Sequence, residues 1–141
     1  MRAMVLRAVV GMGDNPAPLA LTEVAEPVPG PHEILVAVSV CGVCHTELDE
    51  IEGRTPPPAL PVIPGHEIVG RVAAQGNGST RFRKGDRVGI GWIHASTGTD
   101  DENLSEEFRA TGRDVNGGYA EYVVVNEHYA YSIPEVFSDA Q

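Results

Sequence analysis

Basic residues are scarce in this sequence. Lysine and arginine together number 10, against 20 aspartates and glutamates, and the formal net charge is −10. Binding to nucleic acid or to an anionic membrane surface requires a positively charged face. The charge balance therefore argues against both kinds of partner.

Cysteine is also scarce, and long apolar runs are missing. Two cysteines are too few for a disulfide scaffold, which favours a reducing cytoplasm as the location. No run of about 18 apolar residues is present, so no membrane span is predicted. Near the N-terminus an apolar stretch follows two arginines, but Gly13-Asp14-Asn15-Pro16 interrupts it, which argues against a signal peptide.

A nucleotide-binding fingerprint is the third feature that the sequence lacks. Gly11-Met12-Gly13 follows an apolar run, but Asp14-Asn15-Pro16 blocks a helix there and the third glycine is missing. We therefore expect that this chain alone neither binds NAD or NADP well nor transfers hydride.

What the sequence does contain is a series of short apolar runs separated by turns. Its 16 glycines and 11 prolines are consistent with many turns, and its 141 residues suit one domain. Short strands with little helix between them favour an all-β barrel or sandwich. The predicted strands are Met4–Val10, Ile34–Val40, Ile68–Ala74, Arg87–Ile90, Tyr119–Val125 and Tyr129–Ile133, the second of them buried on both faces.

Two segments carry helix signals. Thr99 to Glu102 fits a capping box, which predicts a short surface helix from Asp100 to about Ala110. Ser138 to Gln141 repeats the pattern where the sequence stops, so we expect a helix to begin there. Two interpretations stay open for that second signal: a chain cut from a longer protein, and a frayed terminus.

The segment Cys41-Gly42-Val43-Cys44-His45 is the first candidate for chemistry. It fits a haem attachment motif, a redox pair, half of a zinc site or simply two buried thiols. Haem attachment lacks an export signal, and a redox pair lacks the expected βαβ context. Zinc takes four ligands, and Gly65-His66-Glu67, just before a predicted strand, raises the number available with Cys44 to at most three. His66 taken alone is more often a structural histidine than a ligand.

Four motifs in order then resemble a known family. Cys44-His45-Thr46-Glu47, Gly65-His66-Glu67, Gly85-Asp86-Arg87-Val88 and Gly117-Gly118-Tyr119-Ala120-Glu121-Tyr122 resemble the zinc-dependent medium-chain alcohol dehydrogenases. The similarity runs from about Met4 to Ile133. The resemblance implies a GroES-like catalytic domain, which is a partly open β-barrel with a few short helices.

The resemblance also implies a catalytic zinc site. Cys44, and not Cys41, matches the zinc thiolate, and His66 matches the second ligand. Glu67 matches a carboxylate that can approach the metal and exchange with bound water. Glu47 matches the acid that orients the ligand histidine.

Three more positions match residues that serve the substrate or the cofactor. Thr46 matches the hydroxyl that hydrogen-bonds the alcohol and passes its proton outward. His45 matches a position that contacts the cofactor pyrophosphate or helps to release the proton. Trp92 matches an aromatic wall of the substrate pocket. The implied activity is oxidation of an alcohol to an aldehyde or ketone with NAD or NADP.

The sequence departs from the family pattern in three ways. The family's third zinc thiolate would lie beyond residue 141, so we expect an incomplete zinc site and a chain that is inactive alone. The stretch from His94 to Thr99 and onward has no cysteine, so no structural zinc is expected, and the predicted helix after Asp100 would take that space. Asp49 stands where many relatives have a histidine of the proton relay.

Two alternatives to an enzyme of this kind remain open. One is a non-enzymatic GroES-like binding or assembly module, which would self-associate through the apolar face that a cofactor domain normally covers. The other is a metal-free quinone reductase relative, against which Cys44 and His66 argue.

Overall fold

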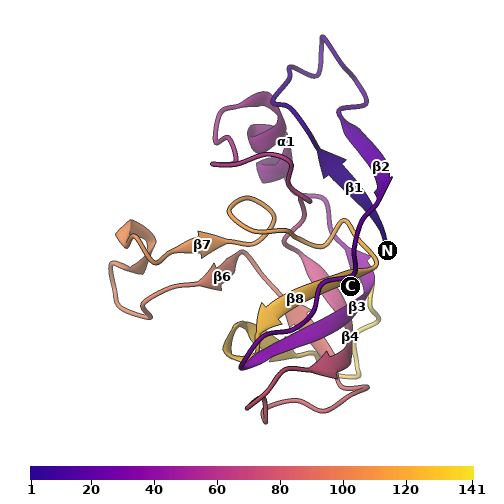
Figure 1. The fold of residues 1–141 in the computed structure, drawn as a ribbon, viewed down its shortest axis with the longest axis vertical. Helices are drawn as coiled ribbons and strands as arrows, with labels where there is room; N and C mark the ends of the chain where they lie inside the picture. Colours follow the sequence, from indigo (N-terminus) through magenta and orange to yellow (C-terminus); the bar gives the residue numbers. More distant parts are fainter.

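The fold centres on one antiparallel sheet of five strands. The structure is a computed structural model that describes residues 1–141, apart from the side chain of Asn103. The strand order is β8-β3-β4-β5-β9, and the sheet curls into a half-barrel (Figure 1). The bounds are β3 (Glu33–Cys41), β4 (Ile68–Gln75), β5 (Arg87–Ile90), β8 (Tyr122–Asn126) and β9 (Ala130–Ser132).

Apolar side chains from these strands form the main core. The two longest strands, β3 and β4, pair along most of their length, with Cys41 opposite Ile68 and Ile34 opposite Gln75. Burial of these alternating side chains away from water is the main source of the sheet's stability. The buried members of this core are Ile34, Val36, Ile68, Val72, Phe82, Val88, Ile90, Val123, Val125 and Ala130.

A smaller layer packs beside the half-barrel. Strands β1 (Arg2–Leu6) and β2 (Leu19–Glu23) form an antiparallel pair, and the helix α1 (His45–Glu52) lies next to it (Figure 1). Leu6, Ile51 and Val62 form a buried cluster that joins β1 to α1. Backbone hydrogen bonds in both directions between Leu6 and Val62 fix the same junction.

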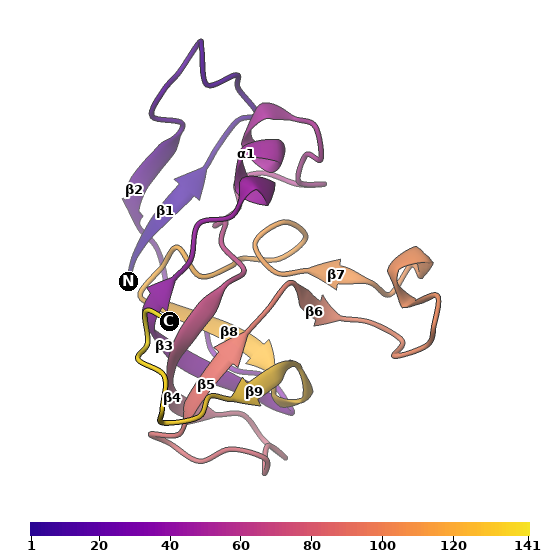
Figure 2. The same cartoon turned by 180° about the vertical axis from the view of Figure 1, so that it is seen from behind.

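A two-stranded arm projects away from the body. It consists of β6 (Ile93–Ala95) and β7 (Arg109–Ala110), with the 3-10 turn η1 (Glu102–Leu104) near its tip (Figure 2). The base of the arm is fastened to η2 (Glu127–Tyr129), because the Tyr129 hydroxyl accepts from the Ser96 amide at 2.9 Å and donates to the Ser96 carbonyl at 3.0 Å.

The helix predicted from Asp100 to Ala110 is wrong. Only the three residues of η1 are helical there, and the segment then extends into β7. The side chain of Leu104 is 81% exposed, so a helix here would have no apolar face to bury. The Thr99 hydroxyl donates to Asp101 at 2.9 Å instead of capping a helix.

The mainly β prediction is confirmed, with shifts at the strand ends. Strand β1 stops at Leu6 rather than Val10, and β8 begins at Tyr122 rather than Tyr119. Only Ile34, Leu35 and Val36 of β3 are fully buried, whereas residues 37–41 are partly buried or exposed. Strands β2, β6 and β7 and helix α1 had not been predicted.

The C-terminal helix signal is met only in part. The Ser138 amide donates to the Gln141 side chain at 3.0 Å, which is one half of a capping box. The segment forms a turn and not a helix. Among the described residues, no helix is long and apolar enough to cross a membrane.

The Glu127 carboxylate ties a loop to the sheet. The side chain is 3% exposed, and its Oε2 accepts hydrogen bonds from the Ser79 hydroxyl at 3.0 Å, the Thr80 amide at 2.9 Å and the Arg81 amide at 2.7 Å. Burial alone would raise the pKa of Glu127, but these hydrogen bonds outweigh it and hold the pKa below its usual value.

We predict that Glu127→Ala lowers the free energy of unfolding by about 2 kcal/mol at neutral pH, because buried donors lose their acceptor. A lowered folded-state pKa stabilises the fold above the unfolded pKa of about 4.3, and this contribution is lost as the pH falls through the folded value. Urea unfolding at several pH values should therefore show that the free energies of unfolding of the parent chain and of Glu127→Ala converge as the pH falls into the acid range.

Glu26→Ala is the matched control. The Glu26 side chain is exposed and makes no hydrogen bond in the described part of the chain, so its loss should change stability by about 0.5 kcal/mol or less. Equal effects of the two substitutions would contradict the anchoring role of Glu127.

Candidate metal centre

Cys44 lies at the start of α1, just after β3 ends. It is the N-cap residue of the helix, with extended backbone angles (φ −108°, ψ 161°). Its amide donates to Glu47 Oε2 at 2.8 Å, so the third helical residue satisfies a backbone donor that the helix leaves open. The helix ends at Gly53, whose φ of 84° is left-handed.

His66 reaches the same place from the loop before β4. Gly65, just ahead of it, has a φ of 99°, which favours glycine, and a side chain there would overlap Tyr119 and Cys41. The His66 residue is only 7% exposed. The Trp92 ring packs edge-on against the imidazole, with 5.0 Å between centroids and 77° between planes.

Three side chains converge there into one group. Each of Cys44, Glu47 and His66 offers an atom that lies within 4.8 Å of the others. His66 Nδ1 lies 2.8 Å from Glu47 Oε1, although neither atom has a hydrogen-bond partner of good geometry among the described residues. Buried polar atoms without a hydrogen-bond partner destabilise the fold unless a ligand or a proton completes their environment.

The charged form of His66 and the charged forms of Cys44 and Glu47 stabilise one another. Burial would raise the pKa of Glu47, but His66 and the Cys44 amide outweigh burial and lower it. Contact with Glu47 raises the pKa of His66. Contact with Thr46, and then with His66, lowers the pKa of the Cys44 thiol. The group therefore combines a readily formed thiolate, an imidazole and a carboxylate.

Such a donor set fits zinc. Thiolate sulfur and imidazole nitrogen are the ligands that zinc commonly takes in proteins, usually four in a tetrahedral arrangement. The carboxylate on one nitrogen of His66 matches the outer partner that fixes the orientation of a ligand histidine. Cys44 and His66 can thus hold the ion, with Glu47 behind His66.

The other predicted site residues lie around this group. Thr46 Oγ1 is 3.5 Å from Cys44 Sγ. His45 is exposed and points its Nε2 to within 3.6 Å of Asp49, which is also paired with Arg54. The structure brings Trp92 against His66, as described above.

Glu67 takes a different direction. It is exposed, and its side chain lies over Gly42, where a Cβ would overlap it. It is not a member of the group formed by Cys44, Glu47 and His66. Its predicted role as a metal ligand stays a prediction.

Sequence reasoning missed Glu50. It follows Glu47 by one helical turn, is 1% exposed, and neither carboxylate oxygen has a partner among the described residues. Burial, and then the charge of Glu47, raises the pKa of Glu50 to about 7. Cysteine is not among the usual N-cap residues, so no local signal around Cys44 predicts α1 or shows that Glu50 lies on its buried face.

A family model matches most of the chain. The model of the alcohol dehydrogenase GroES-like domain covers residues 30–135, a range that includes Cys44, Glu47, His66 and Trp92.

Known proteins agree with this match. An alcohol dehydrogenase from Moraxella sp. (strain TAE123) is 44% identical over 124 residues, which are 83% of this chain and 37% of that protein. A solved NAD-dependent alcohol dehydrogenase has a TM-score of 0.87 at 30% identity and shares 99% of this chain and 41% of its own.

A further solved structure has NADP bound. A protein from Sinorhizobium meliloti 1021, described as a zinc-binding dehydrogenase bound to NADP, has a TM-score of 0.83 at 30% identity, over 98% of this chain and 40% of its own. The present chain spans about two fifths of the length of the proteins it matches.

We predict that Gly65→Ala destabilises the fold by about 3 kcal/mol, because it adds overlap with Tyr119 and Cys41 to the strain of a left-handed φ. Gly85→Ala is the matched control: φ is 95° and nothing lies within 4 Å, so only backbone strain of about 1 kcal/mol is expected. Urea unfolding measures both. Equal costs would show that Gly65 is not required for close packing.

Proposed function

Because the chain belongs to the alcohol dehydrogenase GroES-like domain family, we propose that it is the catalytic domain of a zinc-dependent alcohol dehydrogenase. The whole enzyme would oxidise an alcohol to an aldehyde or ketone with NAD or NADP, bound by a second domain. The observation that carries the proposal is the convergence of Cys44, Glu47 and His66 within 4.8 Å.

Within this proposal each residue of the site has a task. Cys44 and His66 hold the zinc, and Glu47 keeps the imidazole of His66 in the orientation that it needs. Zinc supplies Lewis acidity toward an alcohol oxygen when it is bound. A thiolate ligand requires that Cys44 stays reduced, which a cytoplasmic location provides.

The remaining residues act on the substrate and its proton. The Thr46 hydroxyl, beside Cys44, accepts a hydrogen bond from the substrate hydroxyl and, as it takes that proton at Oγ1, gives its own proton outward. His45 is exposed next to Asp49, where it can pass the proton to solvent or approach the cofactor. The Trp92 ring borders the substrate and excludes water from it. Glu67 is proposed as a carboxylate that reaches the metal after its side chain turns away from Gly42.

The non-enzymatic alternative has its own observation. Val43 and Val136 are each 81% exposed, Tyr131 55% and Phe137 49%. Of these four residues, Tyr131 also lines a hollow of about 400 Å³, together with Gly42 and the last residues of the chain. We propose that this face meets the cofactor domain in the whole enzyme, whereas an assembly module would use it for self-association.

Metal binding is the first test. We predict that the whole enzyme, in which the site can gain its remaining ligand, binds about one zinc at this site by equilibrium dialysis, with binding lost in Cys44→Ala and His66→Ala and weakened about 10- to 100-fold in Glu47→Gln. Trp92, the one tryptophan in the sequence, lies against His66 and reports the same event by fluorescence.

Cys41→Ala is the control for the cysteine. The thiol of Cys41 is partly buried and burial raises its pKa to about 11, so it should not contribute to zinc binding. Zinc binding at this site that survives in Cys44→Ala, or none in the whole enzyme, would favour the assembly module over the enzyme.

Activity is the second test, in the whole enzyme. We predict that Thr46→Ala lowers kcat for alcohol oxidation about 10²- to 10⁴-fold, because the proton loses its acceptor, whereas Thr46→Ser retains most of it. The rate is followed by the absorbance of reduced NAD or NADP. Equal rates for the two variants would rule out the assigned role of the hydroxyl.

A further inference from the structure

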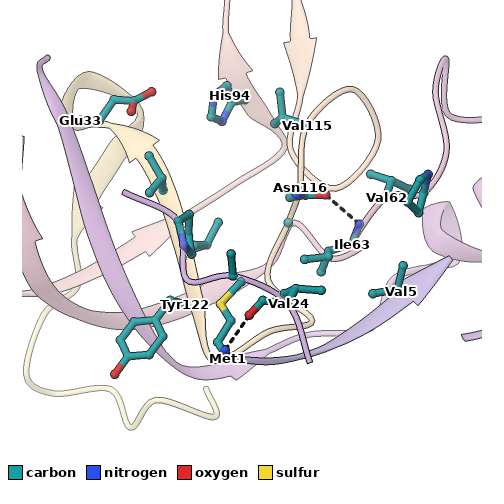
Figure 3. A pocket seen from close by; sticks show the side chains of 16 residues that line it. Met1, Val5, Val24, Glu33, Val62, Ile63, His94, Val115, Asn116 and Tyr122 are labelled. Atoms are coloured by element: carbon teal, nitrogen blue, oxygen red, sulfur yellow. Dashed lines mark hydrogen bonds between the residues drawn. The ribbon is translucent and has the colours of Figure 1, made fainter. Parts of the chain in front are cut away.

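A second cavity lies away from the metal centre. Its volume is about 480 Å³, and it is enclosed by β1, β8, the segments 24–27, 61–63 and 115–117, and His94 of the arm (Figure 3). Most of its lining is aliphatic, including Val5, Val24, Val62 and Ile63.

This cavity is distinct from the proposed reaction site, because different residues line it. Cys44, Glu47, His66 and Trp92 are not among the residues that line it. Its volume falls in the range of about 300–1,000 Å³ that is usual for small-molecule sites, whose walls are mainly apolar with a few polar groups. An apolar cavity of this size is poorly suited to holding ordered water.

Two of the polar groups at the cavity already have partners. Glu33 Oε2 accepts from the Gly30 amide at 2.7 Å, and Asn116 Oδ1 accepts from the Ile63 amide at 3.0 Å (Figure 3 shows the second). His94 differs from them, because its Nδ1 is buried without a hydrogen-bond partner in the described part of the chain. Burial lowers the pKa of His94, so its ring is neutral near pH 7.

We propose that this cavity binds a neutral, mainly apolar small molecule that carries one hydroxyl or carbonyl oxygen. The aliphatic walls take the apolar body, and the oxygen forms a hydrogen bond with His94. The two charged groups of the lining have opposite signs and are both already hydrogen-bonded, the Met1 ammonium to the Val24 carbonyl and the Glu33 carboxylate to the Gly30 amide, each at 2.7 Å. The lining therefore favours neither an anion nor a cation, and a charged ligand would lose its hydration against the aliphatic walls.

The probe for this site is 4-phenylbutan-1-ol, titrated into the metal-free Cys44→Ala variant and followed by NMR. This variant removes the metal centre as a competing site, so the outcome does not depend on the proposed dehydrogenase function. We expect saturable shifts at the Val5, Val62 and Ile63 methyls, with a Kd on the order of 1 mM or tighter. Shifts that are not saturable, or that are confined to Thr46 and Trp92, would overturn the proposal.

A substitution that fills the cavity gives the second arm. Ala25 lines the cavity and is exposed, so Ala25→Trp can enter the space without disturbing the core and should weaken binding at least tenfold. Ala17→Trp, at an exposed position outside the cavity, should leave the Kd unchanged. Equal effects of the two tryptophans would contradict the assignment.

The hydrogen bond to His94 is tested by comparing two probes. In His94→Phe we expect the Kd of 4-phenylbutan-1-ol to rise about tenfold, which is the loss of one hydrogen bond, and that of butylbenzene to stay unchanged. The same change for both probes would remove His94 from the proposed site.

Discussion

The Glu47 carboxylate is the interaction on which the metal centre depends. One oxygen accepts the Cys44 amide at the start of α1, and the other lies 2.8 Å from His66 Nδ1. The same side chain therefore begins the helix that carries Cys44 and orients the histidine that comes from the next loop. The sheet brings these parts together beforehand, because Cys41 and Ile68 are opposite one another in β3 and β4, and the Gly42 amide donates to the Glu67 carbonyl at 2.8 Å.

The surroundings of the Glu47 and His66 side chains are closely packed on one side and open to solvent on the other. Trp92, Gly65 and Tyr119 pack closely around His66 and Cys41, which limits the movement of the imidazole. On the other side Val43 is exposed next to Gly42 in the chain, and the Glu67 side chain lies over Gly42. We propose that the open side receives the cofactor domain, because exposed apolar side chains such as Val43 mark a contact surface.

The sheet was largely predictable from the sequence, and the helix was not. Strands such as β4 and β5 are dense in aliphatic residues and end at glycine turns, so local pattern decides them. Helix α1 is acidic and short, and its stability comes from Glu47 and from Ile51 packing on Leu6 and Val62, which are contacts across the fold. The segment from Asp100 to Ala110 shows the opposite case: its capping pattern is good, but Leu104 is 81% exposed, so burial of its apolar side chain does not hold a helix. Cys44, Thr46 and His66 were identified by motif, whereas the burial of Glu50 depends on which face of α1 turns inward.

The most direct test of this account is X-ray absorption at the zinc edge of the metal-loaded protein. If Cys44 and His66 hold the ion, the spectrum will contain one sulfur ligand at about 2.3 Å and one imidazole nitrogen at about 2.0–2.1 Å, and the sulfur signal will vanish in Cys44→Ala and persist in Cys41→Ala. A spectrum with oxygen and nitrogen ligands alone, or a sulfur signal that disappears with Cys41, would contradict it.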